Sequence, residues 1–198
     1  KKQRQQREIV IQYVLKFVGV VLLAFLLVRF VCFSFTIQGD SMSPTIERGE
    51  KHLVNRLIYQ IKGPSRYDVV IFKSDDKNGN YYVKRVIGLP GEKVQIKDGE
   101  VYIDGDKLKE KYRFPTMENG GLALEEFTLS EGEYFMLCDN RNECEDSRNA
   151  NVGNVMSENI VGKAWIRTNH FTLVNRINGF EQKHADPSAS PTASAAAN

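Results

Sequence analysis

Residues 81–92 read YYVKRVIGLPGE, and this stretch decides the fold class. Its first eight residues are mostly aromatic or β-branched, which is typical of a β-strand, and Leu-Pro-Gly-Glu then supplies a turn. Side chains alternate along a strand, so Lys84 shares one face with Tyr82 and Val86. The stretch therefore predicts a strand that places a lysine between an aromatic and a β-branched neighbour.

Similar runs after residue 35 predict a mainly β, antiparallel domain. They are short, rich in β-branched or aromatic residues, and separated by Gly, Pro, Asn and Asp turns: residues 67–72, 81–88, 93–104, 134–137 and 163–167. Asp98-Gly99 predicts a hairpin within the third run, because both residues tolerate positive φ. We expect a β core at residues 34–92 and 133–180, with a smaller β insertion at 93–132.

A basic segment and a long apolar run precede the β region. Residues 1–8 read KKQRQQRE, and residues 17–28 are uncharged throughout. The wider run of residues 9–33 is long enough, as a helix, to cross a hydrocarbon core of about 30 Å. The alternatives are a buried helix and a cleaved signal peptide, but the bulky VRFVCFSF lacks the small residues of a cleavage site. We therefore expect one transmembrane helix.

Charge and composition restrict the topology and the partners. Basic residues at the N-terminus predict that residues 1–8 stay in the cytoplasm and that the β domain lies outside the cell membrane. A net charge of +2 argues against a nucleic-acid surface. Three cysteines lack the pairing of a structural zinc site, and no metal or organic cofactor is implied. Residues 185–198 are small and polar, and the tail at residues 181–198 is predicted to be disordered.

Residues 38–45, QGDSMSPT, predict a tight turn that presents the Ser41 hydroxyl just after the apolar helix. A serine in such a turn is commonly only a turn residue, and a strand lysine such as Lys84 commonly protects a solvent edge. The functional interpretation requires Lys84 to be desolvated. Burial lowers the pKa of an amine, and a neutral amine can accept a proton from a hydroxyl.

Residues 136–155 contain two Asp-x-Arg triplets, Asp139-Asn140-Arg141 and Asp146-Ser147-Arg148. This stretch is either an ordinary solvated loop or a wall made rigid by bidentate carboxylate–guanidinium bonds.

Together these motifs occur in the order found in type I signal peptidases. The chain resembles the bacterial, single-anchor, Gram-positive-like form, and the resemblance covers residues 10 to about 170. It is carried by Ser41-Met42-Ser43-Pro44-Thr45, Tyr67-Asp68-Val69-Val70, Val83-Lys84-Arg85-Val86-Ile87-Gly88 with Pro90-Gly91, and the two Asp-x-Arg triplets.

The resemblance implies a serine endopeptidase with a Ser–Lys dyad. Ser41 would be the nucleophile and Lys84 the general base, without a histidine. The backbone N–H of Ser41 would contribute to the oxyanion hole. Gly39 stands where some members carry a serine, so it contributes no hydroxyl and allows close backbone approach. Asp139, Asp146 and Arg148 would be structural supports near the dyad.

The resemblance also implies the substrate and its surroundings. Family members bind an extended strand with small residues, Ala-x-Ala, before the cut, and alternate side chains enter the pocket wall. By position, the wall would consist of Phe35, Ile37, Met42 and Val83. The partners would be signal peptides of exported preproteins and the lipid bilayer, with the secretion translocon nearby.

Two cysteines depart from the family pattern. Cys138 stands where glycine is usual, and Cys144 stands where a serine helps to orient the lysine amine. A thiol is a weak hydrogen-bond partner, so Lys84 would be held less firmly. Both cysteines are expected on the oxidising side, either as free thiols or as a disulfide closing a seven-residue loop.

Two other functions fit parts of the sequence. One is an inactive, membrane-tethered relative that binds extended peptides without cutting them, which the two cysteines favour. The other is a self-cleaving Ser–Lys peptidase, which the apolar helix at residues 9–33 disfavours.

Overall fold

The structure is a computed structural model that describes residues 2–74, 80–110, 114–169 and 171–174. Residues 175–180 of the predicted β core and the predicted tail at 181–198 lie outside the described residues.

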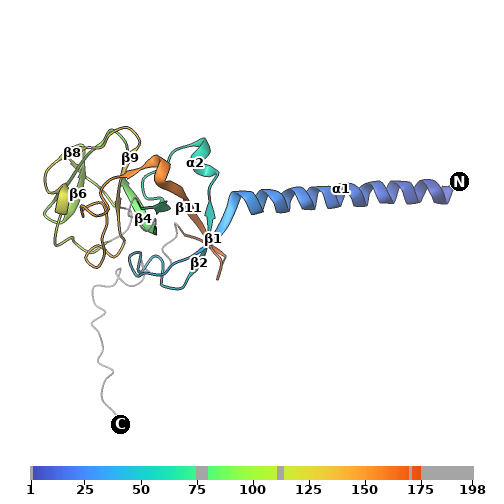
Figure 1. Cartoon of the computed structure of the whole chain (residues 1–198), viewed down its shortest axis with the longest axis horizontal. Coiled ribbons are helices and arrows are strands. Elements are labelled where there is room, and N and C mark those ends of the chain that lie inside the picture. The colour runs from blue at the N-terminus through green and yellow to red at the C-terminus, as the bar shows by residue number, and fades with distance from the viewer. Residues whose placement is uncertain (1, 75–79, 111–113, 170, 175–198) are drawn as a thin grey trace, which may run out of the picture.

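One long helix, α1 (Lys2–Val31), precedes the β domain and projects away from it (Figure 1). Lys, Gln and Arg are good helix formers, so the helix includes the basic segment and starts upstream of the predicted residue 9. It also ends before the predicted residue 33, because strand β1 (Cys32–Thr36) begins there and pairs with β2 (Lys51–Asn55). Cys32 and Phe33 are therefore strand residues and not helix residues.

Within α1, the 20 residues Gln6–Phe25 have a mean hydropathy of 2.0, and none of this span is buried in the protein. Its large side chains are exposed, including Leu15 at 64% and Phe17 at 70%. By length and composition this segment can cross a membrane.

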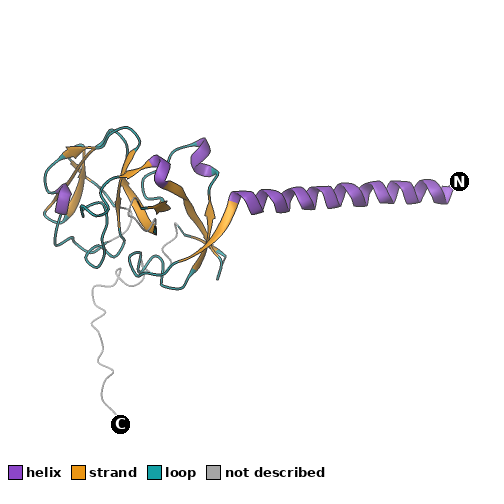
Figure 2. Ribbon diagram, viewed as in Figure 1, coloured by secondary structure: helices purple, strands orange, loops and turns teal. Residues whose placement is uncertain are grey.

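Most strands form one antiparallel sheet with the order β1-β2-β11-β3-β4-β9-β10, and β12 pairs with β11. Figure 2 shows these strands gathered beside the end of α1. The bounds are β3 (Val69–Lys73), β4 (Tyr81–Gly88), β9 (Glu133–Leu137), β10 (Val155–Met156), β11 (Ile160–Arg167) and β12 (Thr172–Leu173). The sequence did not predict β1, β2, β10 or β12, because these strands are short or carry few β-branched residues.

A second sheet of order β7-β6-β5-β8 is built from residues of the predicted insertion. Its strands are β5 (Lys93–Lys97), β6 (Glu100–Ile103), β7 (Asp106–Lys107) and β8 (Phe127–Thr128). The predicted hairpin is confirmed: Lys97 pairs with Glu100, and the turn residues Asp98 and Gly99 have φ values of 53° and 75°. Three short helical segments complete the described chain, α2 (Ile58–Ile61), η1 (Gly121–Ala123) and η2 (Ser157–Asn159).

Strand β4 connects the hydrophobic clusters of the domain. Every residue from Val83 to Gly88 is buried. Val83 packs in the cluster under the Ser41 loop, Ile87 in the cluster beneath the second sheet, and Val86 in a third cluster that Tyr82 also joins. Because apolar layers cover β4 on both faces, its two adjacent basic residues are removed from water. The mainly antiparallel β fold with one N-terminal apolar helix is as predicted.

Candidate active site

Ser41 lies in the loop that joins β1 to β2. The loop is closed at its base by paired backbone bonds between Ile37 and Glu50 (3.0 Å) and between Gly49 and Ile37 (2.8 Å). Met42 and Ile46 are fully buried beneath it, while Ser41 remains partly exposed. The apolar anchors therefore hold the loop down and leave the neighbouring hydroxyl at the surface.

Lys84 is only 3% exposed on strand β4. Its amine lies 5.5 Å from the centre of the Tyr82 ring. Burial lowers the pKa of Lys84 to about 8, and the nearby carboxylates of Asp146 and Glu145 partly oppose this decrease. The lysine is thus the desolvated amine that the functional interpretation required.

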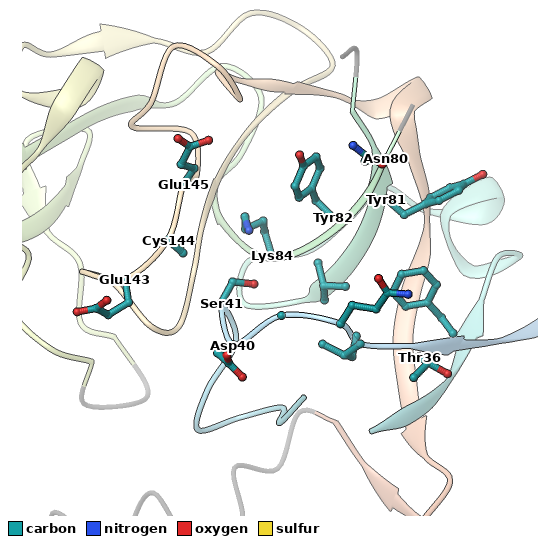
Figure 3. Close-up of a pocket in the computed structure, with 15 residues that line it drawn as sticks. Thr36, Asp40, Ser41, Asn80, Tyr81, Tyr82, Lys84, Glu143, Cys144 and Glu145 are labelled. Carbon is teal, nitrogen blue, oxygen red and sulfur yellow. The ribbon is translucent and has the colours of Figure 1, made fainter. Parts of the chain in front are cut away.

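Ser41 and Lys84 line the same pocket, which has a volume of about 690 Å³ (Figure 3). Its walls come from the end of β1 and the following loop, the start of β4, and the loop between the two Asp-x-Arg triplets. The lining residues are Phe35, Thr36, Ile37, Gln38, Gly39, Asp40, Ser41, Asn80, Tyr81, Tyr82, Val83, Lys84, Glu143, Cys144 and Glu145. The hydrogen bonds of the described residues do not include one between the Ser41 hydroxyl and the Lys84 amine.

Three of the four residues expected to contact substrate are at the pocket wall. Phe35, Ile37 and Val83 line the pocket, whereas Met42 does not. Met42 is fully buried in the same hydrophobic cluster as Ile37 and Val83. It therefore supports the wall from behind, because its side chain points into the core and not into the pocket. Gly39 lines the pocket, and a Cβ added there would meet no atom within 4 Å.

Asp139 joins the two segments that carry Ser41 and Lys84. Its carboxylate is fully buried and accepts hydrogen bonds from Arg85 Nε at 2.7 Å and Arg85 Nη2 at 2.5 Å. It also accepts a short hydrogen bond from the Thr45 hydroxyl. Next to it, the Asn140 N–H donates to the Ser41 carbonyl at 3.1 Å. These contacts fix the Ser41 loop against the strand that presents Lys84.

Asp146 and Arg148 hold the third wall of the pocket. Arg148 donates to both carboxylate oxygens of Asp146, at 2.8 and 2.9 Å, in a buried bidentate pair. Asp146 also accepts a bond from the Cys138 N–H at 3.1 Å. Arg141 donates to the Cys138 carbonyl at 2.8 Å and pairs with Glu110. The second interpretation of the Asp-x-Arg triplets, a rigid wall, is the one that the structure supports.

In the structure a disulfide joins Cys138 to Cys144, with their Cα atoms 6.6 Å apart. Cys138 is buried at the end of β9, and Cys144 lines the pocket. The bridge therefore attaches the pocket wall to the main sheet. Because Cys144 is bonded to Cys138, it has no free thiol that could take the place of the usual serine as a hydrogen-bond partner of Lys84.

The described residues contain one group with the donor types of a metal site, formed by Cys138, Cys144 and Asp146. Both sulfurs are bonded to each other, and the carboxylate is occupied by Arg148. The bridged arrangement does not fit a metal ion, because it offers no free thiolate.

Sequence reasoning missed Arg85, Thr45 and His52. A buried arginine beside Lys84 requires a buried acid, and this requirement could have linked Arg85 to one of the Asp-x-Arg carboxylates. His52 is fully buried, and its Nε2 lies 3.1 Å from Glu50 Oε2. Burial lowers the pKa of His52. It is the one histidine among the described residues, and it does not line the pocket.

Comparisons with known proteins show the family to which the chain belongs. The family model described as "Signal peptidase, peptidase S26" matches residues 10–168. A signal peptidase I of Bacillus licheniformis is 33% identical over 168 residues, covering 81% of this chain and 89% of the relative. A signal peptidase I of Bacillus caldolyticus is 38% identical over 149 residues, covering 70% of this chain and 80% of the relative.

Among solved structures, a signal peptidase I from Enterococcus faecalis V583 matches 52% of this chain and 97% of its own, with 35% identity and a TM-score of 0.41. From the family match and the two Bacillus relatives, the chain belongs to the signal peptidase family, peptidase S26.

The first prediction concerns the Asp139 network. Asp139→Ala leaves the Arg85 guanidinium buried without its carboxylate, which typically costs about 3–5 kcal/mol of unfolding free energy. Asp40→Ala is the matched control, because it breaks only the exposed Asp40–Arg48 pair, and such pairs contribute at most about 1 kcal/mol. The loss of stability in each of the two variants is measured by thermal unfolding of the full chain in detergent micelles. Equal, small losses in both variants would contradict the proposed importance of the network.

The second prediction concerns the disulfide. Alkylation of the denatured, non-reduced chain should modify Cys32 alone, which is a free cysteine in the structure, and reduction should expose two further thiols. Intact mass distinguishes one adduct from three, with Cys32 as the internal control. Three adducts without reductant would show that Cys138 and Cys144 are not bridged in the protein.

Proposed function

We propose that this signal peptidase is a membrane-anchored serine endopeptidase that removes signal peptides with Ser41 as nucleophile and Lys84 as general base. The observation that carries the proposal is the burial of Lys84 in the pocket that also presents Ser41. A pKa of about 8 leaves about one amine in ten neutral at pH 7. For a lysine with an ordinary pKa, fewer than about one amine in a thousand is neutral at this pH.

The reaction is an acyl transfer in two steps. The Lys84 amine takes the Ser41 proton while Oγ attacks the scissile carbonyl carbon, and the carbonyl electrons move to its oxygen. The resulting lysine ammonium then gives its proton to the leaving amine, and an ester to Ser41 remains. Water then attacks the ester carbonyl while Lys84 takes its proton. The bond between the carbonyl carbon and Oγ breaks, the lysine ammonium returns a proton to Oγ, and the carboxylic acid product leaves.

The backbone N–H of Ser41 is suited to stabilise the oxyanion. The described hydrogen bonds use the Ser41 carbonyl, which accepts from Asn140, but none uses the Ser41 N–H. A free donor next to the nucleophile can bind the negative oxygen that develops during attack. The Asn140 side-chain amide donates to the Asp40 carbonyl at 3.4 Å, and this carbonyl shares a peptide group with the Ser41 N–H, so the contact helps to fix the orientation of that donor.

The Ser41 hydroxyl must approach the amine during catalysis, because the two are not hydrogen-bonded at rest. Catalytic hydrogen bonds are often long in substrate-free sites and tighten when substrate binds. Rotation of a serine side chain is fast and requires little space. A bound substrate would exclude water from the pocket, and this would favour the neutral form of Lys84 more strongly than the substrate-free pocket does.

Two strand edges beside the pocket are suited to receive an extended substrate. Strand β1 lies at the edge of the main sheet, and among the described strands it pairs only with β2. Strand β9 pairs with β4 only from Arg85 onward, so the start of β4 has no partner on that side among the described strands. A peptide added there would present alternate side chains to Phe35, Ile37 and Val83. This geometry supports cleavage after small-x-small sites such as Ala-x-Ala.

Helix α1 would serve as the membrane anchor. None of the span from Gln6 to Phe25 is buried in the protein, and lipid would cover its apolar residues more favourably than water does. Basic residues precede the apolar span, so the N-terminus would stay in the cytoplasm and the β domain would face the outside. The pocket would then lie where preproteins emerge from the secretion translocon.

A peptide with Ala-x-Ala before the scissile bond tests the proposal, and Ser41→Ala should lower its turnover by at least about a thousandfold. Ser43→Ala is the matched control, because this nearby serine does not line the pocket, and it should retain turnover. Both variants and the native chain are assayed in detergent micelles by mass spectrometry of the two products. Equal turnover by native chain and Ser41→Ala would refute the nucleophile. Binding without cleavage by the native chain would favour the inactive relative that the cysteines suggest.

A further inference from the structure

The active-site pocket has two chemically different halves, on either side of Ser41 and Lys84. Figure 3 shows Thr36 and Tyr81 on one side and Glu143 and Glu145 on the other. The first side also carries the apolar wall residues of β1 and β4. The second side is the loop between the two Asp-x-Arg triplets. A peptide that crosses the pocket must therefore pass from an apolar half into an acidic half.

The acidic half is not neutralised by the described residues. Glu143 and Glu145 are exposed, and their carboxylates form no ion pair with a described basic side chain. Asp40 also lines the pocket, but Arg48 pairs with it at 2.7 Å. Lys84 is the one basic residue that lines the pocket, and burial makes it partly neutral. Two carboxylates without an ion-pair partner among the described residues therefore remain on this side.

The acidic loop is held in place beside the nucleophile. The Glu143 N–H donates to the Asn140 carbonyl at 3.3 Å, and the next residue, Cys144, is in the disulfide. Asp146, which follows Glu145, is fixed by the bidentate pair with Arg148. Because both flanks of the loop are anchored, its carboxylates stay near the path of the substrate.

The Lys84 amine indicates where a ligand comes to lie. Lys84 is 3% exposed and lies at the middle of the pocket (Figure 3), yet none of the described hydrogen bonds involves its amine. Because the side chain is buried elsewhere and lines the pocket, a substrate that enters the pocket comes to lie against this amine. The carboxylate of Glu145 lies close enough to this amine to raise its pKa. The acidic half thus adjoins the reacting bond itself.

The direction of the substrate follows from the proposed function, on which this inference rests. Small residues before the scissile bond occupy the half walled by Phe35, Ile37 and Val83. The residues after the bond must then leave across Glu143 and Glu145. We infer that Glu143 and Glu145 are specificity-determining residues, which favour basic and disfavour acidic side chains in the first two positions after the cut.

Three peptides test this inference. They share one Ala-x-Ala sequence and differ only in carrying Lys, Gln or Glu at the second position after the bond. For the native chain at low salt, we expect kcat/KM to be about tenfold higher for the Lys peptide than for the Glu peptide. The ratio should fall toward one in the double variant Glu143→Gln/Glu145→Gln and in 1 M salt, because salt screens exposed charges.

The ratio of kcat/KM for two peptides is taken on the same variant, so any change in the ionisation of Lys84 affects both peptides equally and cancels. Glu131→Gln is the matched control, because it removes an exposed carboxylate that does not line the pocket, and it should keep the native ratio. A native ratio near one, or a ratio that survives the double variant, would overturn the inference. If the Gln peptide is cleaved by the native chain but not by Ser41→Ala, the proposed function holds even when the charge preference fails.

Discussion

The buried contact between Arg85 and Asp139 is the interaction on which the site depends. It connects the strand that carries Lys84 to the loop that follows β9, and Thr45 adds the Ser41 loop to the same carboxylate. Removing two charges from water is costly unless their geometry satisfies both groups. Here Asp139 receives two bonds from the guanidinium and one from a hydroxyl. Three segments far apart in the sequence are thereby fixed around one point.

Lys84 and Arg85 show how one strand gives adjacent residues opposite roles. Both are buried, but Arg85 faces a carboxylate in contact with it, whereas Lys84 faces a pocket with an aromatic ring and more distant carboxylates. Arg85 therefore has a structural role. Burial lowers the pKa of Lys84 to about 8, and the more distant carboxylates of Asp146 and Glu145 only partly oppose this decrease, so Lys84 can act as a base.

The lowered pKa of Lys84 also has a cost in stability. Below pH 8 both the folded and the unfolded chain hold the proton, and the cost of burying the ammonium is complete, roughly 3 kcal/mol. Between pH 8 and its ordinary value of 10.5, the unfolded chain binds more protons, so stability rises with pH. The Arg85–Asp139 contact stabilises the same strand and helps to offset this cost.

The sequence predicted the strand at 81–88, the hairpin at 93–104 and the apolar helix, because local patterns of period and turn chemistry decide these elements. It also indicated Ser41 and Lys84 through the order of the motifs. It did not reveal that Arg85 pairs with Asp139, since 54 residues separate them. Nor did it show that Met42 faces the core, because a short loop has no repeating period from which to infer orientation.

The ionisation of Lys84 is the central claim, and its direct titration is the measurement that tests it best. The full chain carrying Ser41→Ala, labelled with ¹³C at lysine Cε and held in detergent micelles, can be titrated by NMR, and Lys84→Arg identifies the resonance. We expect a pKa of about 8 for Lys84. A value near 10.5, the ordinary value of a lysine amine, would contradict a desolvated general base.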